Sequence, residues 1–250
     1  VNSITEVSRN YFRYDLKAPE LQADQLKIYP CSVVDWTKIK EWYEDGSYKP
    51  YSENEEDLIN VIAVIKNNIF PWVRLNRIIR DIPNINILGG NTNVNLRQKL
   101  LAKKEINCKC IRCRQYKGDT IDINDVHLFI REYNAVKSTE YFLSFESQDQ
   151  KILYGFLRLR INHTNDDLIY PELNDCSFIR ELHVYGKIVN HQENPSGDSA
   201  QHIGLGKKLM KEAECITFNN NVPKIAVIAG VGVREYYKKL GYQLEHNYMI

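Results

Sequence analysis

Three cysteines, Cys108, Cys110 and Cys113, fall within six residues of this chain. Thiolates at this spacing suit a tetrahedral zinc ion, which takes four ligands of this soft kind. The fourth ligand could be Cys31, His127 or a water molecule; the alternative is a set of three free, buried thiols. Because the cysteines cluster in this way, reduced thiols fit the sequence better than a disulfide framework. We expect a structural zinc site here, which would fix the fold around it.

A glycine-containing segment runs Gln201-His202-Ile203-Gly204-Leu205-Gly206 and leads into a helix that is expected to begin near Lys207. The first N–H groups of a helix have no intrahelical partner, and the helix dipole places positive charge at that end. Glycines allow the backbone to approach a diphosphate closely. The segment therefore predicts a pyrophosphate-binding loop, although glycines at a loop-to-helix turn are usually structural when they stand alone.

Two adjacent tyrosines, Tyr236 and Tyr237, stand in a predicted helix that ends at Gly241. A phenol has a pKa of about 10 and can protonate a departing thiolate that lies close to it. The alternative is a core aromatic residue beside a helix-terminating glycine. The phosphate loop and the tyrosine helix follow each other at about thirty residues, which favours a chemical role for the pair.

These motifs need a scaffold, and the spacing of the apolar residues predicts a mixed α/β fold. Strand-like segments and amphipathic helices alternate after about Gly118, and two further helices are predicted before it. The expected strands are His127–Tyr133, Tyr141–Phe145, Ile152–Ile161, Ile179–Val184 and Lys224–Ile228. The expected helices are Asp57–Asn67, Asn95–Lys104, Leu205–Ile216 and Val233–Leu240.

The net charge of +1 conceals a strongly basic stretch. Between Lys66 and Lys117 there are twelve Lys or Arg residues and only two acidic ones. Such segregation predicts a surface that faces a polyanion, and the alternative is a solvated helical face. Arg74, Arg77 and Arg80 recur every third residue, so in a helix they would share roughly one face. The residues expected to contact nucleic acid are Arg74, Arg77, Arg80, Arg97, Lys99, Arg112 and Arg114.

No stretch of the sequence indicates a membrane or a secretory pathway. The longest apolar runs, such as Ile59–Ile65 and Ile225–Val231, are too short to cross a bilayer. A charged-then-apolar leader does not open the chain. We therefore expect a cytoplasmic protein, with a nuclear location as the alternative, and no membrane partner.

The loop and the tyrosine helix carry a resemblance to a known superfamily. The loop resembles the Q/R-x-x-G-x-G/A loop of GNAT acetyltransferases, and the helix is similar to their segment in which a tyrosine precedes a K-x-G-aromatic turn. More specifically, the chain resembles the family of Elongator catalytic subunits, which join a radical S-adenosylmethionine (SAM) domain to a GNAT domain. The segments that match, in the family's order, are Leu26–Pro30, Gly46–Ser52, Pro71–Pro83, Asn95–Arg97, Cys108–Arg114, Phe142–Glu146, Arg180–Gly186, Gln201–His202, Lys224–Tyr237 and Tyr248–Met249.

This resemblance implies an acetyl-CoA site. Backbone groups of one strand would hold the pantetheine arm, and Gln201–Gly206 would hold the pyrophosphate. Tyr237 aligns best with the general acid, and Tyr236 would line the cofactor. The strand residues in this role are Glu181, Leu182, His183 and Val184.

Three further side chains are candidates for catalysis on the same ground. Glu146 matches a family glutamate and could act as a base or orient water; the alternative is an exposed carboxylate at the end of a strand. His183 and His202 could relay a proton, because an unshifted imidazole titrates near neutral pH. A structural histidine is the commoner case for either one alone.

The resemblance also implies three parts: residues 1–52 as the tail of a radical SAM barrel, 53–118 as a basic linker with the zinc site, and 119–250 as the GNAT domain. No C-x-n-C-x-x-C cluster stands before residue 100, so SAM and a 4Fe-4S cluster are expected only in a longer protein.

The expected function is the modification of wobble-uridine carbon 5 in tRNA with acetyl-CoA as donor. The expected partners are the anticodon region of tRNA and other Elongator subunits. The rival functions are protein-lysine acetylation and binding of tRNA and acyl-CoA without turnover.

Overall fold

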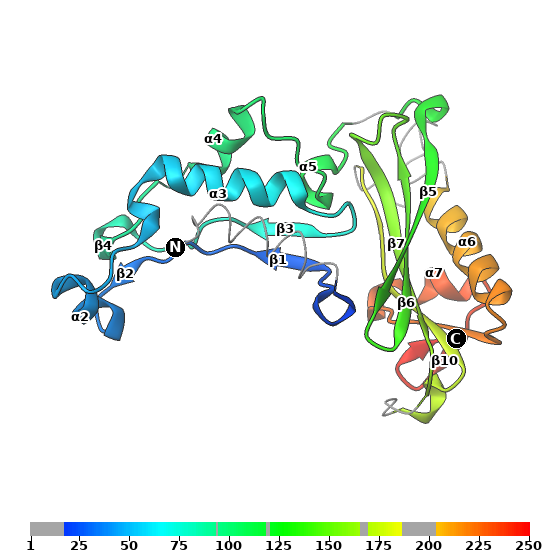
Figure 1. The fold of residues 1–250 in the computed structure, drawn as a ribbon. Coiled ribbons are helices and arrows are strands. Elements are labelled where there is room, and N and C mark those ends of the chain that lie inside the picture. The colour runs from blue at the N-terminus through cyan, green and yellow to red at the C-terminus, as the bar shows by residue number, and fades with distance from the viewer. Residues whose placement is uncertain (1–17, 94, 119–120, 166–169, 187–203) are drawn as a thin grey trace. The chain divides into compact units, whose positions relative to one another are not determined.

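The computed structural model describes residues 18–93, 95–118, 121–165, 170–186 and 204–250. It divides into two compact units, Val1–Cys113 (unit 1) and Arg114–Ile250 (unit 2), and Figure 1 shows the elements of each. The mixed α/β fold predicted from the sequence is confirmed. No helix within the described ranges combines the length and the apolar character that a membrane crossing requires.

Unit 1 is built around α3 (Glu55–Asn68), whose apolar face is buried. Asn54 caps this helix by accepting a hydrogen bond from the Glu56 N–H, and three acidic residues in the first turn complement its dipole. A parallel pair, β1 (Gln25–Lys27) and β3 (Arg74–Arg77), lies beside α3. The other elements are β2 (Val33–Val34), α2 (Lys38–Glu44), β4 (Ile87–Gly89), α4 (Leu96–Ala102) and α5 (Ile111–Arg114), the last of which ends at the first residue of unit 2.

The Arg74–Arg80 stretch is not helical, whereas an arginine at every third position would form one face only in a helix. Arg74–Arg77 forms β3, and its partner in β1 is more than forty residues away in sequence. Leu75 is fully buried against α3, whereas its neighbour Arg74 is only partly covered. Burial of alternate side chains is the pattern of a strand, so the three arginines share no helix face.

Unit 2 contains a seven-stranded sheet in the order β10-β11-β9-β8-β7-β6-β5. All pairs are antiparallel except β8 with β9. The five predicted strands are present with boundaries shifted by up to three residues. The strands are β5 (His127–Ala135), β6 (Ser138–Glu146), β7 (Leu153–Asn162), β8 (Cys176–Val184), β9 (Lys224–Val227), β10 (Leu244–Glu245) and β11 (Tyr248–Met249).

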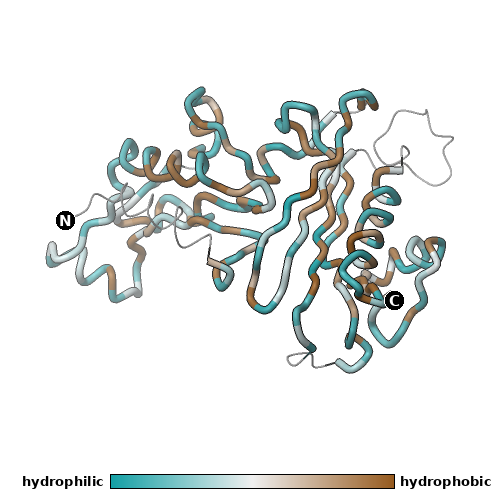
Figure 2. Tube along the Cα trace, turned by 45° about the vertical axis from the view of Figure 1, so that its right-hand side comes forward, coloured by the Kyte–Doolittle hydropathy of each residue, from teal (hydrophilic) through white to brown (hydrophobic). Residues whose placement is uncertain are grey.

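Two helices, α6 (Leu205–Asn219) and α7 (Arg234–Lys238), pack on one face of this sheet. Their apolar residues meet those of the central strands, and Figure 2 shows hydrophobic residues concentrated along these strands. The main members of this core are Leu143, Leu157, Leu159, Ile179, Leu205, Leu209, Met210, Ala213, Val227, Tyr237 and Met249. Short 3-10 helices complete the chain: η2 (Pro19–Leu21), η3 (Tyr51–Glu53), η4 (Asn84–Asn86), η5 (Ile123–Asp125), η6 (Pro171–Leu173) and η7 (Val231–Val233).

Candidate acyl-donor site and cysteine cluster

Strands β8 and β9 separate partway along their length. They pair only from Cys176 to Ile179, whereas β7 follows β8 as far as Val184. A β-bulge lies on β8 at Arg180, since Arg158 pairs with Glu181 and the next residue of β7 pairs with Ile179. A bulge bends a strand and increases its twist. On the side that faces β9, residues 181–184 pair with no described strand, so their backbone groups can receive an extended ligand.

The side chains of this separated segment alternate between the two faces of the sheet. Leu182 and Val184 pack against the core under α6. Glu181 instead forms an ion pair with Arg158 Nε at 2.9 Å. The His183 ring lies 4.4 Å from the Tyr185 ring, centroid to centroid. The structure thus brings Leu182 and Val184 to the helix side, and a relay role for His183 stays a prediction.

The N-terminus of α6 points into the same region. Gly204 is the N-cap in the left-handed conformation, with φ of 73°, which glycine adopts without strain. A Cβ on Gly206 would lie 3.0 Å from the Tyr236 hydroxyl oxygen and 3.7 Å from Val184 Cγ2. The first turn has no acidic residue, so its free N–H groups and the helix dipole favour an anion. Gln201, His202 and Ile203 lie outside the described residues.

The two tyrosines of α7 have different surroundings. The Tyr236 hydroxyl is shielded from solvent, has no hydrogen-bond partner among the described residues, and lies against Gly206. Burial raises the pKa of Tyr236. Tyr237 packs in the core beside Tyr242, and burial raises the pKa of Tyr237 to about 12. Of the two hydroxyls, that of Tyr236 is therefore the one beside the start of α6, whereas the family resemblance had favoured Tyr237 as the proton donor.

The surroundings of Glu146 are those of a structural ion pair, and the catalytic role expected for it stays a prediction. Its carboxylate is fully buried and pairs with Arg131 through two bonds of 2.8 and 2.9 Å and with Arg114 at 2.8 Å. The Ser144 hydroxyl donates a further bond of 2.7 Å. Burial pushes the pKa of Glu146 upward, but the two guanidinium groups outweigh it and hold the pKa below its usual value. A carboxylate with these partners is an anchor for two arginines.

The same contacts involve Arg114, whose expected contact with tRNA stays a prediction. Only 6% of this residue is exposed, and its guanidinium is committed to Glu146. Its side chain therefore contributes to the interior of unit 2.

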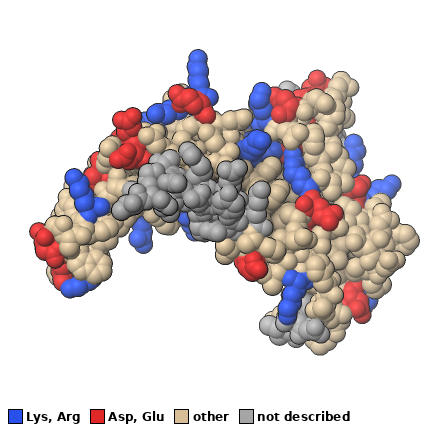
Figure 3. Space-filling model, in the orientation of Figure 1, with Lys and Arg blue, Asp and Glu red and all other residues tan. Residues whose placement is uncertain are grey.

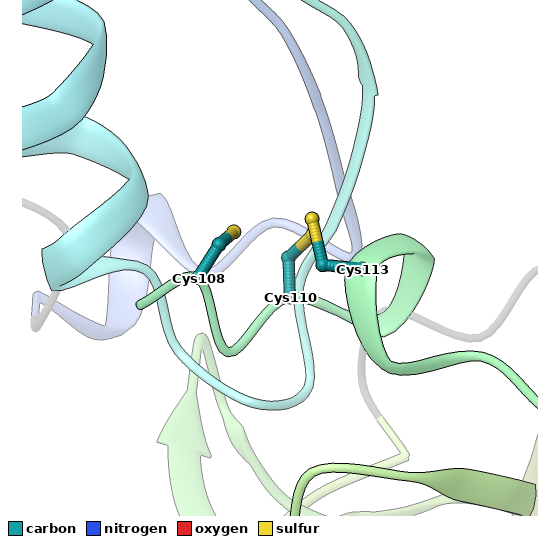
Figure 4. A group of neighbouring side chains, drawn as sticks. All are labelled: Cys108, Cys110 and Cys113. Carbon is teal, nitrogen blue, oxygen red and sulfur yellow. The ribbon is translucent and has the colours of Figure 1, made fainter. Parts of the chain in front are cut away.

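The three cysteines of the predicted metal site meet in unit 1. Their sulfur atoms all lie within 4.8 Å of one another, and Figure 4 shows the side chains together at the start of α5. Cys110 is fully buried. Three thiols gathered in this way fit the donor set of a structural zinc ion. Cys31, in the same unit, does not belong to the group; its backbone carbonyl accepts a hydrogen bond from Ser52. His127 lies in unit 2 and stays a predicted fourth ligand.

A buried lysine beside the cysteines escaped sequence analysis. Lys66 is 1% exposed, and its ammonium lies 3.5 Å from Cys113 Sγ. A cation in this position stabilises thiolates and so prepares them to bind a metal. Lys66 stands seven residues after Ile59 and four after Ile62, which places it on the apolar face of α3. A lysine on an apolar helix face is the pattern from which its burial could have been predicted.

The predicted nucleic-acid contacts fall into two sets. Arg97 and Arg112 both donate to the Asn76 carbonyl, and Arg74 Nε donates to the Asn76 side chain at 3.1 Å, so three guanidinium groups meet at the end of β3. Burial first, and then the charge of Arg112, lowers the pKa of Arg97.

The remaining basic residues of this stretch are more dispersed. Arg77 pairs with Asp81 and Lys99 with Glu55, each at 2.6 Å, and Arg80 lies over the Tyr29 ring. On the face seen in Figure 3, basic and acidic side chains are interspersed.

Comparison with known proteins gives this arrangement its context. The Radical_SAM C-terminal domain family matches residues 23–107. The tRNA uridine(34) acetyltransferase of Methanocaldococcus jannaschii is 39% identical over 255 residues, which cover 98% of this chain and 46% of that protein. Elongator complex protein 3 of Dictyostelium discoideum is 41% identical, with 92% of this chain and 42% of that protein covered. A solved structure of archaeal Methanocaldococcus infernus Elp3 with an N-terminus deletion superposes with a TM-score of 0.84 at 37% identity, covering 99% of this chain and 60% of that one.

The chain belongs to the Elongator complex protein 3 family. It spans about half the length of the curated relatives it matches. The match to the radical SAM C-terminal domain ends just before the cysteine cluster, and the boundaries predicted at residues 52 and 118 stay predictions.

Proposed function

We propose that unit 2 is the acyl-donor domain, of GNAT type, of a tRNA uridine acetyltransferase and that it binds acetyl-CoA where β8, the start of α6 and Tyr236 meet. The observation that carries this proposal is the meeting of Val184, Gly206 and the unpartnered Tyr236 hydroxyl within a few ångströms. The pyrophosphate would take the free N–H groups at the N-terminus of α6. The pantetheine arm would add to the exposed backbone edge of residues 181–184 in the manner of an extra strand.

Tyr236 would serve the cleavage of the thioester. When a nucleophile adds to the acetyl carbonyl and the C–S bond breaks, the sulfur leaves with the bonding electron pair. The raised pKa of Tyr236 keeps its hydroxyl protonated at neutral pH, so its hydrogen can be donated to that sulfur, and the phenol regains a proton from solvent.

In unit 1 we propose that Cys108, Cys110 and Cys113 hold a zinc ion, with Lys66 offsetting the negative charge of the thiolates. The ion would supply structural cross-linking. Radical chemistry with SAM and a 4Fe-4S cluster would belong to the longer protein. Three guanidinium groups near Asn76, from Arg74, Arg97 and Arg112, would contact phosphates of the tRNA anticodon region. Association with other Elongator subunits and a cytoplasmic or nuclear location complete the proposal.

The test is acetyl-CoA binding by calorimetry together with free-thiol release, each with and without tRNA. Binding with tRNA-stimulated thiol release supports the proposal. Turnover that depends on a lysine peptide would instead support protein acetylation. Binding without any turnover would support a binding module, and no binding of acetyl-CoA overturns the proposed site.

A further inference from the structure

On the sheet face opposite α6, unit 2 has a hollow that none of the functions above uses. Its volume is about 340 Å³, within the usual range for a small-molecule site. It lies where the β5–β6 turn, the end of β7, the first half of β8 and the residue after β9 meet. Its lining comprises Val136, Lys137, Arg160, Asn162, Thr164, Phe178, Arg180 and Ile228.

Two arginines of this lining share one buried carboxylate. Glu140, almost fully buried, accepts from Arg180 Nη2 at 2.8 Å and Nε at 3.1 Å, and from Arg160 Nη1 at 3.3 Å. Arg160 is fixed further by Asn162, which accepts from its Nε at 2.8 Å. With Lys137 included, the hollow carries a net charge of +2. The side chains of Arg160 and Arg180 are 33% and 25% exposed, respectively. Each therefore contacts the buried Glu140 and still presents part of its surface to solvent.

Rigid guanidinium groups of this kind match the oxygen atoms of a phosphate group. Apolar surface from Phe178 and Ile228 lies in the same hollow and offers a place for a ribose or a base. The hollow therefore combines charged side chains, which suit a phosphate, with apolar side chains, which suit the rest of a nucleotide.

The position of the hollow relates it to the proposed donor site. Arg180 is the bulge residue of β8, and Ile228 directly follows β9, so both stand where the two strands begin to separate. The α6 N-terminus and Tyr236, which we assign to acetyl-CoA, contribute no residue to the hollow. Donor and hollow thus lie at the same strand junction but use different residues.

We propose that this hollow binds the phosphate of a nucleotide, and that the nucleotide belongs to the RNA substrate. This deepens the proposed function and rests on it for the identity of the RNA. The same phosphate chemistry could be offered by the 3′-phosphate of coenzyme A, so the experiment separates the two sources.

The experiment measures binding of tRNA and of acetyl-CoA to the same variants of the whole chain. Lys137→Met removes one positive charge from the hollow, and Arg180→Lys keeps the charge but removes the forked guanidinium group. The matched control is Lys151→Met, which changes an exposed lysine of the β6–β7 turn. We expect Lys137→Met to weaken tRNA binding about fivefold at low salt and to reduce the slope of log Kd against log salt by about 0.7–1, as for one lost phosphate contact. Acetyl-CoA affinity and thiol release should stay at the level of the control.

The outcomes are distinguishable from a failure of the proposed function. If acetyl-CoA affinity falls in place of tRNA affinity, and acetyl-dephospho-CoA shows no such loss, the phosphate site holds and its ligand is the coenzyme. If neither affinity differs from the Lys151→Met control while Arg180→Lys is folded by circular dichroism, the hollow binds no phosphate and the inference is overturned. In that case acetyl-CoA cleavage by the wild-type chain would remain intact.

Discussion

Replacement of Glu146 by glutamine separates a structural role from a catalytic one. In the native chain the carboxylate lies fully buried between Arg114 and Arg131. The amide is nearly the same size, so the change removes the charge and leaves the volume. Two guanidinium groups, 5% and 16% exposed, would then lack their counter-charge.

The expected loss of stability is large. Removing one partner of a buried ion pair costs about 3–5 kcal/mol, because the remaining charge stays buried without compensation. For a unit of this size, with a urea m-value of about 2 kcal/mol/M, such a loss lowers the unfolding midpoint by roughly 1.5–2.5 M. Glu245→Gln, an exposed change on β10 in the same unit, serves as the control and should move the midpoint little.

The assay must report on unit 2 alone. Tryptophan fluorescence does not, since Trp36, Trp42 and Trp72 all stand in unit 1. Amide hydrogen exchange in β5 and β6 peptides, measured by mass spectrometry across a urea series, gives the stability of the strands that carry Arg131 and Glu146. Unit 1, followed by its fluorescence, provides an internal reference.

The pH dependence supplies an independent check. The pKa of Glu146 is depressed in the folded state, so its contribution is complete above the unfolded value of about 4.3 and is lost as the pH falls through the folded value. The Glu146→Gln substitution should remove this part of the acid destabilisation. If the variant keeps wild-type protection in β5 and β6 but loses acetyl-CoA turnover, Glu146 is a catalytic base and our reasoning is refuted.

Three further predictions concern the two sites. Tyr236→Phe should lower the rate of thiol release from acetyl-CoA by about 100-fold with little change in affinity, whereas Tyr237→Phe should stay within about threefold; the reverse order would return the role to Tyr237. Gly206→Ala should weaken acetyl-CoA binding, because the new Cβ lies 3.0 Å from the Tyr236 hydroxyl, and Gly230→Ala, whose Cβ meets nothing within 4 Å, should not; calorimetry on both decides this. Cys110→Ser should lower the zinc content of the purified chain and the urea midpoint of its tryptophan fluorescence, while Cys215→Ser, an exposed change in unit 2, should leave both unchanged; equal zinc content in the two variants would contradict the metal site.

Local patterns in the sequence were sufficient for much of the fold. Apolar spacing identified α3 and α6 because each buries one face against a single layer. The strand β3 was missed because its conformation depends on pairing with β1, which no local window contains. Arg74 and Arg77 lie on this strand and Arg80 in the loop after it, and all three side chains are at least partly exposed to solvent.

The candidate site divides in the same way. Gly206 and the tyrosine pair could be proposed from the sequence because glycine and phenol chemistry depend on residue type. The assignment between Tyr236 and Tyr237 needed three-dimensional coordinates, since adjacent helical residues differ by about 100° in direction. The burial of Glu146 and Arg114 could not be predicted, because each is a charged residue in sequence and only their mutual contact removes them from solvent.

The bulge at Arg180 changes which residues of β8 face the core. Ile179 faces the core, and the next core residues are Leu182 and Val184, so the strand changes parity once between them. A substitution at Arg180 would alter one side chain and leave the bulge in place. Deletion of the residue would make the pairs Arg158–Glu181 and Leu159–Ile179 successive, so the bulge would disappear while Leu182 and Val184 still faced α6. The strand would then lose the bend that the bulge produces where β8 leaves β9, so the presence of an extra residue here matters more than its side chain.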